Sequence, residues 1–93
     1  MKIQIKQTEI ELKHKMRSLL IYEQIANKPF NPLTITDMML YFYSTILACE
    51  PNIDLSFTEF MDIVDDEPKL FKSLTLTVSS FFFGIIFKYT ILF

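Results

Sequence analysis

The side chains that most often carry chemistry are scarce in this chain, and their spacing completes no familiar site. There is one histidine, His14, and one cysteine, Cys49. A structural zinc site usually takes four Cys or His ligands, and a nucleophilic relay needs a base beside a serine or cysteine. Neither can be built around these two residues. We therefore expect His14 at the surface and Cys49 as a small buried thiol at the end of an apolar helix.

Four acidic side chains that could bind a cation lie close together in the sequence. An EF-hand loop alternates its oxygen ligands and needs a glycine at its sharp turn, and this cluster has neither. A solvent-exposed helix face is the simpler interpretation. The sequence thus predicts no catalytic residue, no metal site and no cofactor, and we expect a protein that is not an enzyme. The four acidic residues are Asp62, Asp65, Asp66 and Glu67.

Methionine and aromatic residues are a third group with a binding use, because flexible thioethers adapt to varied apolar partners. Here they recur at helical spacing, which favours burial in the core for most of them. An adaptable groove remains the alternative interpretation. The residues concerned are Met38, Met39, Met61, Phe57 and Phe60.

Size and charge limit the classes of function further. Ninety-three residues make one domain, 51% of them hydrophobic, with a net charge of -2. Residues 1–28 hold six basic and three acidic side chains, whereas residues 29–68 hold eight acidic and no basic ones. Nucleic-acid binding depends on Lys and Arg contacts to phosphates, so we expect no nucleic-acid partner. A single glycine also argues against Gly-rich phosphate loops.

Residues 2–13 predict a β-hairpin. Two pairs of apolar residues each alternate with polar neighbours, but the phase changes between the pairs, so one strand cannot place all four on one face. A hairpin can. The expected register pairs Ile3 with Leu12, Ile5 with Ile10 and Lys6 with Glu9, around a Gln7-Thr8 turn.

Three helices are expected near 15–26, 36–49 and 57–66. The first carries a broad apolar stripe, and the second is apolar around almost its whole circumference, which places it at the centre of the fold. The third has apolar residues at one-face helical spacing. The first stripe consists of Met16, Leu19, Leu20, Ile21 and Ile25; the third consists of Phe57, Phe60, Met61 and Val64.

Capping residues mark where these helices begin and end. Thr34 and Asp37 have capping-box spacing, and Ser56 and Glu59 form a better capping box. Asn27 is a plausible left-handed cap, and Pro29 follows it. Pro68 ends the third helix and can begin another. The sequence thus predicts an α+β, mainly helical fold: an N-terminal hairpin packed on three or four helices in one domain, 1–72.

The segment 73–93 is different in character, because it is strongly apolar and Lys88 is its only charge. A helix over 74–93 would be about 30 Å long, the thickness of a bilayer core. Its first residues, however, alternate apolar and hydroxyl side chains as a strand does. A membrane span, a core segment and a tail from a shifted reading frame all remain open.

Three local motifs carry a resemblance to a known family. A helix ends in the loop Lys28-Pro29-Phe30, Thr36-Asp37 opens an aromatic helix, and Leu55-Ser56-Phe57 opens a helix that ends in acidic residues before Pro68. In these features residues 16–71 resemble the tail assembly chaperones of long-tailed phages and prophages. The short N-terminal hairpin also fits, although a glycine-containing turn is more usual in that family.

The resemblance implies a role in assembly in the host cytoplasm. Such chaperones bind the long apolar tape measure protein, keep it soluble, help to recruit tail tube subunits and then leave. They are often made in two lengths by a programmed frameshift. A relative would continue after Phe71 with charged helical sequence, and the apolar tail departs from this pattern. A shifted frame predicts that another frame of the coding DNA restores polar helical sequence after codon 72.

Two other interpretations remain. A tail-anchored membrane protein would keep residues 1–72 in the cytosol, with Lys69 and Lys72 flanking the span on that side. The isolated apolar residues near Met1 do not resemble a signal peptide, so we expect a cytosolic start. A third possibility is a globular domain whose core the tail completes. An oligomer is compatible with all three.

Overall fold

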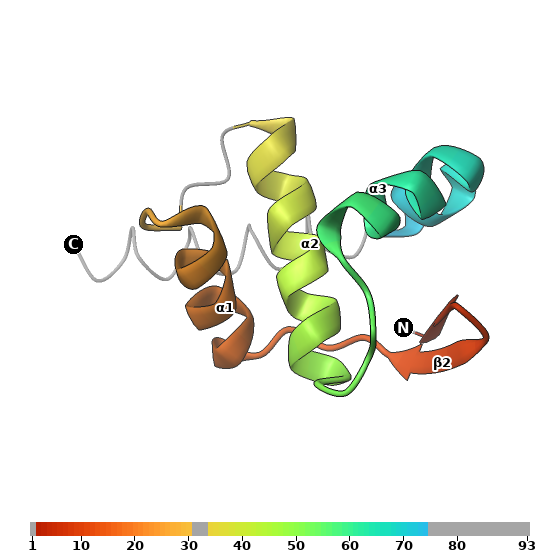
Figure 1. Ribbon diagram of the computed structural model, residues 1–93, viewed down its shortest axis with the longest axis horizontal. Coiled ribbons are helices and arrows are strands. Elements are labelled where there is room, and N and C mark those ends of the chain that lie inside the picture. Colours follow the sequence, from red (N-terminus) through yellow and green to blue (C-terminus); the bar gives the residue numbers. More distant parts are fainter. Residues whose placement is uncertain (1, 31–33, 75–93) are drawn as a thin grey trace.

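A computed structural model describes residues 2–30 and 34–74 of the chain (Figure 1). Within these ranges a two-stranded antiparallel sheet is followed by helices, which confirms the predicted α+β, mainly helical fold. From residue 75 on, the predicted apolar segment lies outside the described residues. The elements are β1 (Lys2–Ile5), β2 (Thr8–Glu11), α1 (Met16–Ala26), α2 (Ile35–Cys49) and α3 (Phe57–Asp66), and residues 68–74 are also helical.

The hairpin forms where expected, but the predicted register is wrong. Ile3 pairs with Ile10 and Ile5 pairs with Thr8, and the turn is Lys6-Gln7. Both turn residues have positive φ, 52° and 65°, which is the pattern of a type I′ turn built without glycine. A two-residue type I′ turn matches the right-handed twist of the strands, and this geometry outweighs the unfavourable residue types.

The same face of the hairpin is buried in the predicted and in the observed register. The two registers differ by two residues, and side chains two residues apart on a strand lie on the same face. Ile3, Ile5, Ile10 and Leu12 are all buried. The expected ion pair across the strands changes partners: Glu9 lies beside Lys2, at 3.5 Å, and Lys6 reaches out of the hairpin altogether.

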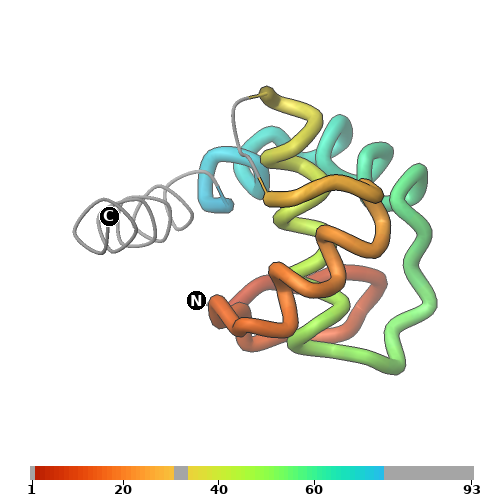
Figure 2. The backbone as a smooth tube through the Cα atoms, turned by 90° about the vertical axis from the view of Figure 1, so that its left-hand side faces the viewer, coloured from red at the N-terminus to blue at the C-terminus, as the bar shows by residue number. Residues whose placement is uncertain are grey.

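Helix α2 lies between α1 and α3 and also contacts β2 (Figure 1). Figure 2 shows the same core from the α1 side, with α1 packed along α2. Most of the residues of α2 from Met39 to Ala48 are buried, as predicted for a helix that is apolar all round. Phe30 packs against Tyr22 and Tyr41 at ring-centroid distances of 5.2 and 5.1 Å, so it fills the gap between α1 and α2.

The predicted caps are confirmed. The Thr34 hydroxyl accepts a hydrogen bond from the Asp37 backbone N–H at 3.1 Å, and α2 begins one residue later. Ser56 and Glu59 form a reciprocal capping box at the start of α3. Asn27 takes the left-handed conformation, with φ of 56°, at the end of α1. Pro68 begins the helical residues 68–74.

The face that α1 buries differs from the predicted stripe. Ser18 and Tyr22 are fully buried, whereas Met16, Leu20 and Ile25 are exposed. The reason lies in the partner helix: Tyr22 donates a hydrogen bond to Asp37 of α2 at 2.8 Å, and the small Ser18 fits a buried position on the same face. The stripe was too broad to fix one buried face, and these contacts across the chain decided it.

Candidate functional site

His14 and Cys49 pack and form hydrogen bonds between α2 and the segment before α1. His14 is half-buried, and its ring contacts the Tyr41 hydroxyl through Nδ1, so the expectation of a surface histidine is wrong. Cys49 is half-buried. Its thiol donates to the carbonyl of Lys13 at 3.2 Å and accepts from the Lys13 N–H at 3.3 Å. Both contacts join the segment before α1 to α2.

The acidic cluster lies at the end of α3, and its four side chains are exposed. Within residues 2–30 and 34–74, no three His, Cys, Asp or Glu side chains come close enough together to hold a metal ion. One member of the cluster, Asp65, has a different position from the others because it lines an apolar groove.

This groove is the candidate site. It lies between the start of α2, the end of α3 and the helical residues 68–74, and has a volume of about 340 Å³. Its floor includes the buried Met39 and Val64, whereas Ile35 on the rim is 72% exposed. Met61 is half-buried, so its flexible thioether is accessible. The lining residues are Ile35, Met39, Met61, Val64, Asp65, Pro68 and Phe71, and we call this set the α2–α3 groove.

Exposed apolar side chains also lie on α1. Met16 is 70% exposed, Leu20 55% and Ile25 42%. Met16 and Leu20 are four residues apart and so lie on one face of α1. Single exposed apolar residues are common, but two large ones on one helix face make that face a candidate contact surface.

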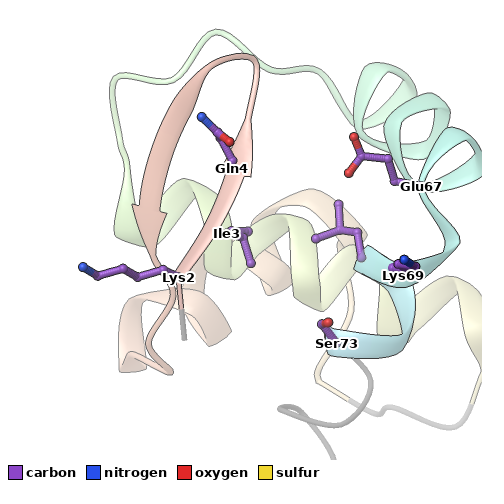
Figure 3. A pocket seen from close by; sticks show the side chains of 7 residues that line it. Lys2, Ile3, Gln4, Glu67, Lys69 and Ser73 are labelled. Atoms are coloured by element: carbon purple, nitrogen blue, oxygen red, sulfur yellow. The ribbon is translucent and has the colours of Figure 1, made fainter.

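A second hollow lies between β1 and the helical residues 68–74 (Figure 3). Its volume is about 230 Å³. Gln4, Glu67, Lys69 and Ser73 on its walls are exposed, and Lys2 extends away from it (Figure 3). A specific ligand site needs a few buried polar groups that converge on one point. This hollow has an exposed polar lining and is a surface depression.

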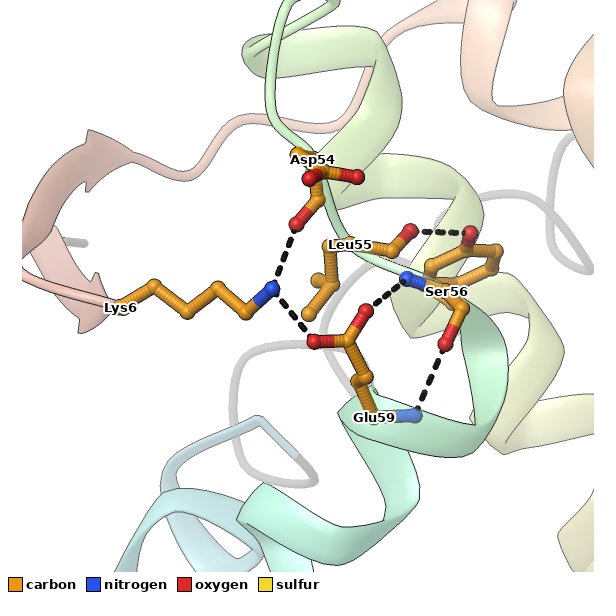
Figure 4. Close-up of polar contacts among 6 residues, drawn as sticks. Lys6, Asp54, Leu55, Ser56 and Glu59 are labelled. Atoms are coloured by element: carbon orange, nitrogen blue, oxygen red, sulfur yellow. Dashed lines mark hydrogen bonds and ion pairs between the residues drawn. The ribbon is translucent and has the colours of Figure 1, made fainter.

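A polar clamp ties the hairpin to α3 (Figure 4). The Lys6 ammonium donates to the Asp54 carbonyl at 2.7 Å and forms an ion pair with Glu59. Glu59 also accepts from the Ser56 N–H at 3.2 Å, as part of the capping box. Hydrogen bonding to Glu59 raises the pKa of Lys6, and the same bond lowers the pKa of Glu59. Nearby, the Tyr43 hydroxyl donates to the Leu55 carbonyl at 2.6 Å. These contacts fix the start of α3 and hence one wall of the α2–α3 groove.

A second polar cluster fixes the start of α2, which is the other wall. Asp37 is 4% exposed. Its carboxylate accepts from the Lys28 ammonium at 2.7 Å, the Tyr22 hydroxyl at 2.8 Å and the Thr34 hydroxyl at 2.9 Å. These donors, led by Lys28, lower the pKa of Asp37. The buried charge is therefore well compensated, and the cluster is structural.

Comparisons with models of known families, with curated proteins and with solved structures gave no match to this chain. Among the described residues, no helix combines the length and the apolar character that crossing a bilayer requires. The function must therefore be argued from the groove and the exposed apolar side chains.

The alternative prediction of a methionine groove is partly realised. Met39 and Met61 line the α2–α3 groove, whereas Phe60 is fully buried in the core and Phe57 packs beside Tyr43 at a centroid distance of 5.5 Å. Met38 does not line the groove. No sequence pattern indicated that Ile35, Pro68 and Phe71 share a surface, because only the packing of α2, α3 and the helical residues 68–74 brings them together.

Proposed function

We propose that this protein is a non-enzymatic assembly chaperone that binds an apolar helical segment of its partner. One observation carries the proposal: a helical domain leaves large apolar side chains exposed on α1 and around a groove that two methionines line. Exposed apolar surface of this kind marks protein–protein contacts, and methionine suits partners of varied shape. By the resemblance of residues 16–71, the partner is the tape measure protein of a long-tailed phage, and the tail tube protein is a second partner in the host cytoplasm.

Co-expression tests this function. The tape measure protein of the same genome would be produced with and without this chain, and its soluble fraction and co-purification would be measured. We expect more soluble tape measure protein and a complex that survives gel filtration. A soluble fraction that does not change, with no complex, would contradict the proposal.

A matched pair of variants separates specific binding from general solubilisation. Leu20→Ser removes an exposed apolar side chain from α1, and Thr58→Ala changes an exposed residue outside both surfaces. We expect the first variant to weaken the complex and the second to leave it intact. Equal behaviour of the two variants would argue against a contact through α1.

Membrane anchoring is a second candidate function, favoured by the apolar composition of residues 74–93, where Lys88 is the only charge. This segment is long enough in sequence for a bilayer span. Carbonate extraction of membranes from cells that express the full chain tests it. A protein that stays with the membrane pellet supports anchoring, and release into the supernatant excludes it.

A further inference from the structure

We infer that the α2–α3 groove selects an amphipathic helix that carries a Lys or Arg beside its apolar stripe, and that Asp65 determines this preference. The inference deepens the proposed function and rests on it only for the existence of an apolar helical partner. It names the chemistry of that partner, the groove that receives it and the residue that reads its charge.

The shape of the groove favours side chains presented by a helix. Its walls are the helices α2 and α3 and the helical residues 68–74, and its volume of about 340 Å³ is at the small end for a ligand pocket. Such a space accommodates a few anchor side chains of a larger partner. An amphipathic helix supplies anchors at i, i+3 or i+4 and i+7, and it needs no free strand edge to bind.

The floor of the groove sets the apolar part of the preference. Met39 and Val64 are buried beneath the opening, and Met61 is half-buried beside it. Ile35 on the opposite rim is 72% exposed, although it belongs to the first turn of α2. Leucine, isoleucine or methionine anchors would remove this surface from water, which is the main source of affinity in such contacts.

Charge complementarity determines the preference for a basic residue in the partner. Among residues 2–30 and 34–74, Asp65 is the one charged residue that lines the groove, and it is exposed. Asp62, Asp66 and Glu67 surround it in sequence and are exposed too. Residues 29–68 contain no Lys or Arg. On the third wall of the groove, Lys69 lines the hollow beside β1 instead, and Lys72 is exposed and does not line the groove. A partner with a basic residue beside its stripe therefore meets an attractive field, whereas an acidic partner is repelled.

A binding experiment with the full chain tests the inference without the natural partner. The probe is a fluorescein-labelled synthetic helix of about 16 residues, or four turns, with leucines at i, i+3, i+4 and i+7 and lysines beside this stripe. A matched peptide has glutamate in place of each lysine, and a third peptide has the lysine composition in scrambled order. Fluorescence anisotropy measures the affinities at about 50 mM and about 500 mM salt, because screening by salt weakens contacts between exposed charges.

Two matched variants locate the effect. Asp65→Lys reverses the charge in the groove, and Asp66→Lys reverses its exposed neighbour, which does not line the groove. Both substitutions place a cation near the end of α3, where the helix dipole favours it, so neither should unfold the protein. Ile35→Ser tests the apolar rim at an exposed position.

We expect the lysine peptide to bind about fivefold more tightly than the glutamate peptide at low salt, and the scrambled peptide to bind weakly. Asp65→Lys should reverse the order of the two peptides, whereas Asp66→Lys should largely preserve it. Ile35→Ser should weaken both peptides. High salt should reduce the difference between them.

Several results would overturn the inference. One is equal binding of the lysine and glutamate peptides at low salt, and another is the same response to Asp65→Lys and Asp66→Lys. If neither peptide binds and sedimentation shows a dimer that Ile35→Ser dissociates, the groove is an interface between copies. If neither peptide binds, the chain is a monomer and hydrogen exchange shows that the backbone amides around the groove are protected, then another segment of the same chain fills the groove.

Failure of the inference and failure of the proposed function are distinguishable. If the complex with the tape measure protein is unaffected by Asp65→Lys and Ile35→Ser, the proposed chaperone function stands, but the groove is not the binding site. If the groove selects the lysine peptide but the protein has no effect on the tape measure protein, the inference about the groove stands and the tape measure protein is excluded as the partner.

Discussion

At the scale of single residues, Asp37 shows how this fold accommodates a buried charge. Its carboxylate is 4% exposed and accepts hydrogen bonds from Lys28, Tyr22 and Thr34. The three donors come from α1, from the residue after its cap and from the cap of α2. One carboxylate therefore joins two helices and the loop between them.

The pH dependence of folding follows from this contact. Because the folded-state pKa of Asp37 lies below its usual value near 3.9, the charged form favours the folded state. This contribution to stability is present above the unfolded-state pKa and is lost as the pH falls through the lower folded-state pKa. We expect Asp37→Asn to lower stability at pH 7 and to flatten its dependence on pH below about 5.

Urea unfolding between about pH 3 and pH 7 measures this effect. Asp66→Asn is the control, because it removes one negative charge from an exposed position on α3. It should preserve the dependence on pH of the natural chain. If stability depends on pH in Asp37→Asn as steeply as in the natural chain, other carboxylates cause the loss of stability at low pH.

Tyr41 makes a second contribution to the pH dependence of folding. Its burial raises the pKa of the phenol to about 12. The folded state retains the phenol proton more tightly than the unfolded chain, whose tyrosine pKa is about 10. The contribution of Tyr41 to stability is therefore fully present below about pH 10 and is lost as the pH rises from about 10 to 12. The phenol neighbours His14, which contacts it through Nδ1.

At the scale of elements, α1 shows that its buried face is not its most apolar one. Ser18 and Tyr22 are fully buried, and Leu20 is 55% exposed. Substitutions should follow the observed packing. Ser18→Leu, which adds apolar volume, should destabilise by about 1–3 kcal/mol through overpacking. Leu20→Ser should change stability by less than about 0.5 kcal/mol.

Urea unfolding of both α1 variants provides the measurement. If the broad apolar stripe were the buried face, the two effects would be exchanged. A large loss of stability in Leu20→Ser would thus contradict the arrangement of α1 and restore the face expected from the sequence.

The hairpin turn makes a separate prediction for an element. Lys6 and Gln7 both have positive φ, a conformation that costs L-residues with a Cβ roughly 1 kcal/mol or more. Gln7→Gly should therefore stabilise the protein by about 0.5 kcal/mol, after the larger entropy of glycine in the unfolded chain is subtracted. Gln4→Gly is the matched control, because Gln4 lies exposed within β1.

The control should have the opposite sign, since glycine within a strand is destabilising. Thermal unfolding of the two variants and the natural chain gives the comparison. If Gln7→Gly is destabilising too, the turn does not have the two positive-φ residues on which the register depends.

At the scale of the whole molecule, Lys6 links the hairpin to the helices. Its ammonium contacts Glu59 and the Asp54 carbonyl, more than 40 residues away along the chain. A two-stranded ribbon is marginal alone, so this clamp and the buried isoleucines must hold it. The clamp lies at the surface, and its contribution is therefore modest.

Lys6→Met removes the charge and keeps most of the side-chain length. We expect faster amide exchange in residues 2–11, by a few-fold, with little change in α2. Lys13→Met is the control, because Lys13 is exposed and its described contacts to Cys49 are made by the backbone. Hydrogen exchange followed by mass spectrometry measures both. An equal effect in the two variants would show that the clamp does not couple the hairpin to α3.

The groove is also a property of the whole molecule. Ile35, Val64 and Phe71 belong to three separate helical segments, and only their packing produces one apolar depression. The acidic character of the sequence around Asp65 was predictable from composition, because residues 29–68 lack basic residues. The position of Asp65 in the lining was not, because its acidic neighbours have the same chemistry.

The sequence by itself determined the order of the elements and most of their ends. Thr34, Ser56, Asn27 and Pro68 act within a few residues of their own positions, so local chemistry is enough to place them. The apolar circumference of α2 likewise placed it at the centre. Tertiary structure alone decided the hairpin register, the buried face of α1 and the groove. Each depends on partners far away in the sequence, as Tyr22 depends on Asp37. No local periodicity contains that information.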